Sequence, residues 1–186
     1  PQPEAALKFG PNIAEWPPIP ALADNLLMQV ASVLRDPVTT TDELIPSGET
    51  ASYRSNPMKL ASFALSRRDP DYVPRALDTQ ALETARQAGS MPAHVQEALE
   101  KLGQGSLAPA AFQIGSVIFA NKPGDGSARE QAASCQRVLG GCANICYEFA
   151  TKRYRSNCVN WGMLPFTLAE GDAFTCQPGD FIYVPD

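Results

Sequence analysis

The chain has 186 residues, 44% of them hydrophobic, and a net charge of -5, which is enough for one domain with a buried core. The acidic balance argues against a dedicated nucleic-acid-binding surface. No apolar run approaches the roughly 20 residues that span a bilayer, and the proline-rich start lacks the basic and apolar regions of a secretory signal. We therefore expect a globular domain with neither a membrane nor a nucleic acid as its partner.

The first 24 residues are predicted to form a proline-rich linker. Six of the first twenty residues are proline, a composition typical of connections between domains. The chain begins at Pro1, without a methionine, and ends at Asp186 just after a short apolar stretch. We expect a folded domain over residues 25–186 that is cut from a longer protein, and a complete small subunit is the alternative.

Five irregularly spaced cysteines occur, namely Cys135, Cys142, Cys146, Cys158 and Cys176. An odd number without a Cys-x-x-Cys pair is a poor disulfide framework, which favours a reducing, cytoplasmic location. We expect these cysteines to be small buried hydrophobic residues. The single histidine, His94, is expected to be structural or on the surface, so the chain should not hold a metal by itself.

The first half of the chain begins with one clear strand. Residues 25–34 alternate branched and other apolar side chains, which predicts a strand. A polar turn over 35–42 ends this strand and presents Asp42. Apolar residues at helical spacing after Pro57 indicate a short helix.

A helical insert is predicted at about residues 70–103. Asp78 is predicted as the N-cap of a helix over 79–88, and Pro92 is expected in the first turn of a second helix. A stripe facing the core is predicted on that second helix from Val95, Leu99 and Leu102. The insert carries no obvious chemistry.

Strands and helices alternate in the second half. We predict helices over 130–139 and 153–161, and strands over 111–120, 142–149, 164–168, 173–176 and 181–184. This alternation indicates an α/β layered domain or barrel.

The stretch Gly124-Asp125-Gly126-Ser127-Ala128-Arg129-Glu130 is the most informative part of the chain. A strand, a glycine turn and a helix start place Ser127 and Arg129 where backbone N–H groups are unpaired and the helix dipole favours anions. Ser127 supplies a hydroxyl, and Arg129 supplies a rigid cation suited to a carboxylate. This predicts a site for a small carboxylic acid, although Ser127 alone could serve only as an N-cap.

The block from Gly124 to Gly141 resembles the active-site loop and helix of the aconitase superfamily, Gly-x-Gly-Ser-Ser-Arg-Glu-His-Ala-Ala, which closes in Leu-Gly-Gly. Residues 156–165 resemble the family's Thr-Asn-Leu and Gly-Leu-Leu-Pro, and Thr40-Thr41-Asp42 matches its Thr-Thr-Asp. Arg54 falls where the family carries a substrate-binding arginine. The motifs occur in the family's order and cover about residues 25–166.

The resemblance implies an α/β fold, the three-layer β/β/α swivelling-domain barrel of the aconitase C-terminal type, with the helical insert as an addition. It implies part of a hydro-lyase that dehydrates and rehydrates a hydroxy di- or tricarboxylate. A [4Fe–4S] cluster would be bound by other domains of the full-length protein, so this chain is expected to be inactive alone. The resemblance makes Ser127 the catalytic base, with Asp42 orienting Arg54 or joining the proton network. It assigns substrate binding to Arg54, Arg129, Gly126 and Ala128.

Three departures from the family pattern leave the identity of the substrate open. Ala128 stands where the family usually has a second serine, and Gln131 and Glu43 each replace a histidine. Ser127, Arg129 and Arg54 are retained, so the reaction type is kept. Several other polar residues are expected to play no part in the chemistry: solvated charges at Arg67, Arg68, Arg153 and Arg155, and a backbone contact at Asn157.

Other hypotheses remain open at this point. One is a free-standing small subunit of a heteromeric enzyme of the isopropylmalate-isomerase type. Another is a non-catalytic RNA-binding or regulatory domain, although the negative net charge disfavours RNA binding. The last is a structural domain with a decayed site.

Overall fold

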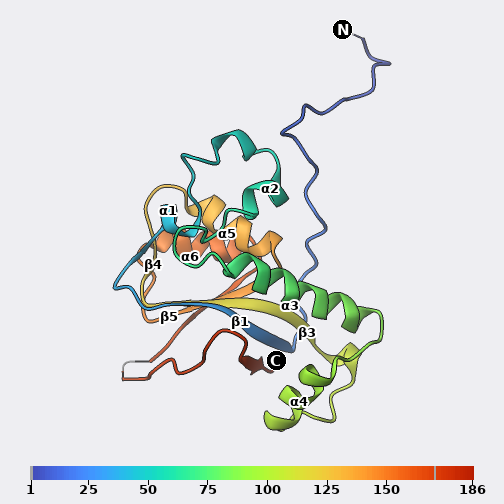
Figure 1. Ribbon diagram of the computed structural model, residues 1–186, viewed down its shortest axis with the longest axis vertical. Coiled ribbons are helices and arrows are strands. Elements are labelled where there is room, and N and C mark those ends of the chain that lie inside the picture. Colours follow the sequence, from blue (N-terminus) through green and yellow to red (C-terminus); the bar gives the residue numbers. More distant parts are fainter. Residues whose placement is uncertain (1, 170) are drawn as a thin grey trace.

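The computed structural model describes residues 2–169 and 171–186 (Figure 1); Pro1, the first residue of the predicted linker, and Glu170 lie outside the described residues. A five-stranded sheet in the order β6-β5-β3-β1-β7 forms the centre of the molecule. Its strands are β1 (Leu26–Leu34), β3 (Gln113–Ala120), β5 (Gly141–Cys146), β6 (Leu164–Thr167) and β7 (Phe181–Val184). Strand β7 is antiparallel to β1, and the other pairs are parallel.

A second, two-stranded sheet pairs β2 (Thr39–Thr40) in parallel with β4 (Pro123–Asp125). Strand β2 follows the carboxyl end of β1, and β4 follows the carboxyl end of β3. The sequence did not predict these strands, because two or three residues are too few to show an alternating pattern. Their pairing brings two distant parts of the chain together.

Helices cover one face of the central sheet (Figure 1). They are α1 (Thr41–Leu44), α2 (Pro57–Ala61), α3 (Tyr72–Gln87), α5 (Arg129–Val138) and α6 (Lys152–Asn160); α4 (Ala93–Lys101) lies beyond the end of α3, and η1 (Ala51–Tyr53) and η2 (Pro109–Ala111) are short 3-10 turns. Their apolar faces pack on the sheet in the main core. Of the described helices, none combines the length and the apolar character that crossing a membrane requires.

The opposite face of the sheet is covered by the segment between β6 and β7. Phe174 of this segment stacks on Phe119 of β3 with ring centroids 4.2 Å apart. A strand over 173–176 was predicted and is wrong. The backbone of Phe174 makes its hydrogen bonds to side chains: its N–H donates to Tyr147 Oη, and its carbonyl accepts from Arg35. These backbone groups therefore do not need a neighbouring strand as a partner. The α/β layered class is confirmed.

The helical segment differs in three details from the prediction. Helix α3 begins at Tyr72 and is preceded by Asp71 rather than Asp78, because buried Tyr72, Ala76 and Thr79 extend its core face by two turns. Pro92 is the N-cap of α4 and stands just before the helix. Leu102 does not face the core, since it is the C-cap residue and is 39% exposed.

Glu83 fastens α3 to the beginning of β3. Its carboxylate accepts the backbone N–H of Ile114 at 2.8 Å, is paired with Arg86 at 2.7 Å and accepts from Gln87 at 2.8 Å. Burial by itself raises the pKa of this carboxyl, but the hydrogen bonds from Arg86, Ile114 and Gln87 bring it below its ordinary value. The charged form therefore stabilises the fold.

We expect Glu83→Gln to lower the free energy of unfolding at pH 7 by about 1–3 kcal/mol, because it removes charge-assisted hydrogen bonds. In the wild type this contribution is complete above the ordinary glutamate pKa and is lost as the pH falls through the lowered pKa of the folded state. The difference in the free energy of unfolding between wild type and Glu83→Gln should thus shrink as the pH falls from about 6 to about 3. Urea unfolding across this range measures it. The exposed control Glu100→Gln should change little, and an undiminished gap at pH 3 would contradict the assignment.

Candidate functional site

The predicted site loop lies where the small sheet meets α5. Residues 126–128 connect β4 to α5, while α1, which begins with Thr41, contacts both of these elements. The Thr40-Thr41-Asp42 and Gly126-Ser127-Ala128-Arg129 motifs are therefore neighbours, although more than 80 residues separate them in the sequence. The carboxyl ends of parallel strands are where α/β folds bind ligands.

Two glycines allow the loop to approach its neighbours closely. Gly126 has a φ of +131°, and a Cβ there would collide with Thr41 Oγ1. Gly124 has a φ of +95°, and a Cβ there would overlap the ring of Tyr154 in α6. The loop is thus held between α1 and α6 in a conformation that only glycine adopts readily.

The first turn of α5 is left uncapped by any side chain. Its N-cap is Ala128, which cannot accept a hydrogen bond through its side chain, and Ser127 is exposed. The alternative role of Ser127 as the N-cap is therefore wrong. Hydrogen bonding within the helix begins with the N–H of Ala132, which donates to Ala128. The backbone N–H groups that precede Ala132 in this turn have no partner within the helix and can bind an anion.

Both predicted substrate arginines lie beside this turn. Arg129 is the first residue of α5 and half-buried, and its buried Nε has no hydrogen-bond partner among the described residues. Arg54 is exposed at the end of η1 and lines a small cavity together with Glu130 and Gln131 of α5. Ser127 and Arg129 thus lie at the start of α5, and the cavity that Arg54 lines runs along the same helix from Glu130 to Val138.

Asp42 pairs with Arg67, whereas one of the two roles expected for it was to orient Arg54. Its carboxylate is 2.6 Å from Nη1 of Arg67, and Nη2 of Arg67 is 2.5 Å from Glu49. Among the described residues no ion pair joins Asp42 to Arg54. The hydrogen bond and charge of Glu49, together with Asp42, raise the pKa of Arg67 above its ordinary value. The expectation that Arg67 is merely solvated is thus wrong.

Glu43 explains one departure from the family pattern. Thr40 and Glu43 form a capping box at α1, in which Thr40 Oγ1 accepts the N–H of Glu43 at 3.2 Å and Glu43 accepts the N–H of Thr40 at 2.7 Å. Glu43 and Asp36 also pair with Arg68, which had been expected to be solvated. Glu43 is therefore a structural residue of the site's rim.

The proline-rich segment is attached to the domain near the site. The N–H of Ala14 donates to Ser55 next to Arg54 at 2.9 Å, and Trp16 stacks on Trp161 of α6 with centroids 4.9 Å apart. Further along, the buried Arg137 of α5 donates to the carbonyl of Pro20. This segment thus borders the cavity that contains Arg54, a role that its composition did not reveal.

A buried polar network fixes the position of α5. Gln136 donates to Tyr154 Oη at 2.8 Å, Tyr154 donates to Asn144 at 3.0 Å, and Asn144 donates back to Gln136 at 2.9 Å. These three residues come from α5, α6 and β5. Because each polar group is satisfied, the network rigidifies the elements that carry the site.

The cysteines that the structure describes are not grouped with other ligating side chains. Burial raises the pKa of four thiols to about 12, those of Cys135, Cys142, Cys146 and Cys158. Burial thus favours the protonated thiol, whereas a metal takes thiolate ligands. In the part of the chain that the structure describes, no three acidic, histidine or cysteine side chains are grouped to hold a metal ion. The residues present therefore do not fit an iron–sulfur cluster.

Comparison with known proteins found sequence similarity in the second half of the chain. Residues 110–171 match the family model described as the aconitase C-terminal domain. Aconitate hydratase A of Bradyrhizobium diazoefficiens is 42% identical over 64 residues, which are 34% of this chain and only 7% of that protein's length. The matched part of this chain includes the loop with Ser127 and all of α5 and β5.

A solved structure extends the similarity to the whole fold. The crystal structure of 3-isopropylmalate dehydratase from Methanocaldococcus jannaschii superposes with a TM-score of 0.52 at 20% sequence identity. The similarity covers 86% of this chain and 70% of the dehydratase chain. The predicted fold class, the α/β swivelling-domain barrel of the aconitase C-terminal type, is confirmed, and its sheet is curled into a half-barrel.

Proposed function

We propose that the chain is the swivel domain of an iron–sulfur hydro-lyase, because residues 110–171 match the aconitase C-terminal domain and 64 residues are 42% identical to an aconitate hydratase. The reaction is the reversible removal of water from a hydroxy di- or tricarboxylate. The domain supplies the base and the carboxylate-binding arginines and is inactive without its cluster-bearing partner domains. The proposal includes a cytoplasmic location and no nucleic-acid partner.

One observation carries this proposal. The β2–β4 pair brings Thr40-Thr41-Asp42 beside the loop that presents Ser127, at the uncapped start of α5. Arg129 begins α5, and Arg54 lines a cavity beside Glu130 and Gln131 of the same helix. These positions support the proposal that an exposed hydroxyl, unpaired backbone donors and two cations act on one small anionic molecule.

In the proposed reaction Ser127 accepts the proton from the substrate carbon. A serine hydroxyl in water is far too weak an acid to supply its alkoxide at neutral pH. The N–H groups and dipole of α5 and the charge of Arg129 would stabilise the alkoxide and lower the pKa of the hydroxyl. Gly126 allows the loop to take the φ that places Ser127 there, and Ala128 leaves room that the family usually fills with a second hydroxyl.

Arg54 and Arg129 would hold the substrate carboxylates. A guanidinium can bind a carboxylate through two parallel hydrogen bonds, which fixes its orientation as well as its position. Asp42 takes part in the proton network, and its carboxylate is held by Arg67, which is itself paired with Glu49. The protein supplies an oriented set of charges around the reacting carbon.

The cluster belongs elsewhere in this proposal. Four of the five cysteines are buried, and burial raises the pKa of their thiols, which disfavours the thiolate form that a cluster needs. It would be held by the remaining domains of the same protein or by a large subunit. The substrate would lie between that part and the loop at Ser127.

The test is a turnover assay of the whole enzyme, reconstituted anaerobically with iron and sulfide, on a panel of hydroxy di- and tricarboxylates. We expect one of them to be dehydrated. Arg54→Gln should lower kcat/KM about 10- to 150-fold, because it removes charge-assisted hydrogen bonds worth about 1.5–3 kcal/mol. Lys59→Gln, on the neighbouring helix, is the matched control. An intact cluster with no turnover of any hydroxy acid would overturn the proposal.

A second arrangement is favoured by the extent of the structural similarity. The match to the 3-isopropylmalate dehydratase chain covers most of both chains, so this chain could instead act as a separate subunit. Denaturing mass spectrometry of the natural enzyme distinguishes the two arrangements. A long polypeptide that contains this sequence indicates a domain, whereas a short one that co-purifies with a larger cluster-bearing chain indicates a subunit.

A further inference from the structure

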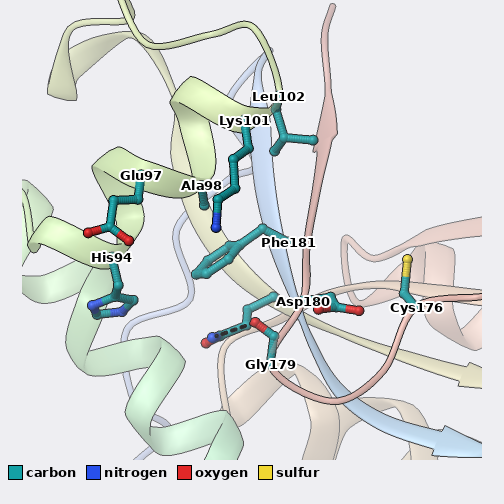
Figure 2. Close-up of a pocket in the computed structure, with 10 residues that line it drawn as sticks. His94, Glu97, Ala98, Lys101, Leu102, Cys176, Gly179, Asp180 and Phe181 are labelled. Carbon is teal, nitrogen blue, oxygen red and sulfur yellow. Dashed lines mark hydrogen bonds between the residues drawn. The ribbon is translucent and has the colours of Figure 1, made fainter.

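A second pocket lies between α4 and the turn before β7 (Figure 2), and α4 is at the other end of the molecule from β4, which precedes Ser127 (Figure 1). Its volume is about 510 Å³, which falls in the range of small-molecule sites. Helix α4 forms one wall, and the turn before β7 forms the other. Gln29, near the start of β1, lies between them, whereas Asp42 follows the other end of this strand.

Both walls are fixed before any ligand arrives. Helix α4 is anchored through Val95 and Leu99, which are fully buried in a core cluster with Leu27. The opposite turn is bonded to the β1 backbone, because the N–H of Gly179 donates to Val30 at 2.8 Å and Gln29 donates to the carbonyl of Gly179 at 3.2 Å (Figure 2). A ligand would not have to order these walls on binding.

The charged groups of α4 that line the pocket have no partner within the described residues. His94, Glu97 and Lys101 lie on one face of the helix, and no ion pair or side-chain hydrogen bond of theirs is present there. Glu97 and Lys101 have the spacing that ordinarily pairs on a helix. Their charged ends nevertheless point apart, with the ammonium of Lys101 directed toward the ring of Phe181 (Figure 2).

The rest of the lining is mainly apolar. Phe181 presents its ring between the two walls, 6.4 Å from the ring of His94, and Leu102 and Ala98 extend this surface. Asp180 opposite is already engaged, since its carboxylate accepts the N–H of Gln177 at 2.7 Å. Among the described residues that line the pocket, the carboxylate of Glu97 and the ammonium of Lys101 thus have no partner and lie beside an aromatic surface.

We propose that this pocket binds a small zwitterion of the α-amino acid class with an apolar side chain. The ammonium of the ligand would bind Glu97, its carboxylate would bind Lys101, and its side chain would pack on Phe181 and Leu102. A dicarboxylate is disfavoured, because its second carboxylate would meet Glu97. The proposal does not depend on the reaction at Ser127.

The test is isothermal titration calorimetry of the full chain with L-phenylalanine. Two analogues each lack one charge, 3-phenylpropanoate without the ammonium and 2-phenylethylamine without the carboxylate. We expect L-phenylalanine to bind, and each analogue to bind about tenfold more weakly for the loss of one charge-assisted contact. Lys101→Met and Glu97→Gln should weaken L-phenylalanine binding by a similar factor, while Glu100→Gln, which does not line the pocket, should not.

Three results would overturn the proposal. The first is no heat of binding with L-phenylalanine, the second is equal binding of the amino acid and its analogues, and the third is a wild-type affinity in both pocket variants. Preferential binding of malate in place of the amino acid would also overturn it. None of these outcomes bears on the hydro-lyase proposal, since the assay needs neither cluster nor turnover.

Discussion

Replacing Ser127 by alanine is expected to lower kcat of the reconstituted enzyme roughly 10²- to 10⁴-fold, the usual contribution of a general base. The change removes the one atom that accepts the proton and leaves the helix start intact. Because the N-cap is Ala128 and Ser127 is exposed, the substitution removes no cap hydrogen bond. The free energy of unfolding should therefore change little, which separates a catalytic role from a structural one.

The assay follows formation of the unsaturated acid by absorbance, with the cluster content of each protein measured alongside. Ser90→Ala, an exposed serine between α3 and α4, is the matched control and should retain full activity. The dependence on substrate concentration should show the loss in kcat more than in KM, because the hydroxyl acts in the transition state. Equal activity of Ser127→Ala and wild type would remove Ser127 from the mechanism.

Replacing Gly124 by alanine is expected to destabilise the domain by about 2–5 kcal/mol, the sum of backbone strain and overpacking. Gly124 has a φ of +95°, and its new Cβ would overlap the ring of Tyr154. Tyr154 cannot move away, because it is fully buried and bonded to Gln136 and Asn144. The carbonyl of Gly124 also accepts from Thr151, the N-cap of α6, so movement of the loop would disturb that helix.

Gly89→Ala is the control that separates the backbone strain from the steric overlap with Tyr154. Gly89 has a similar φ of +80°, and the space around its Cβ position is open. Gly89→Ala should therefore lower the free energy of unfolding only by the backbone strain, about 1–2 kcal/mol. Urea unfolding of both variants measures the two effects. Equal destabilisation would show that the contact with Tyr154 does not constrain the loop. Activity should fall with Gly124→Ala even where the protein remains folded, since the loop carries Ser127.

The site loop could be predicted because its signals are local. An apolar strand, glycines and a helix start follow one another within about thirty residues, and each is favoured by the chemistry of its own residues. The positions of Ser127 and Arg129 at the start of α5 follow from that order. Arg54 could be assigned only through the family pattern, because nothing in its own turn indicates a ligand.

The partners of these residues could not be predicted. Arg67 lies 25 residues from Asp42 and 18 from Glu49, and an exposed arginine in a polar turn looks the same whether it is paired or solvated. Similarly, proline content indicated a linker but gave no sign that Trp16 would stack on Trp161. The pocket at α4 needed the meeting of residues 94–102 with residues 176–181.

The sequence by itself determined the α/β class, most element positions and the strand–glycine loop–helix that presents Ser127. These depend on periodicity, capping and turn chemistry, which act between residues close in the chain. Tertiary structure decided which arginine holds Asp42, where α3 begins and why 173–176 is not a strand. Each of these depends on contacts between distant segments, whose free energies exceed local preferences only once the sheet has brought those segments together.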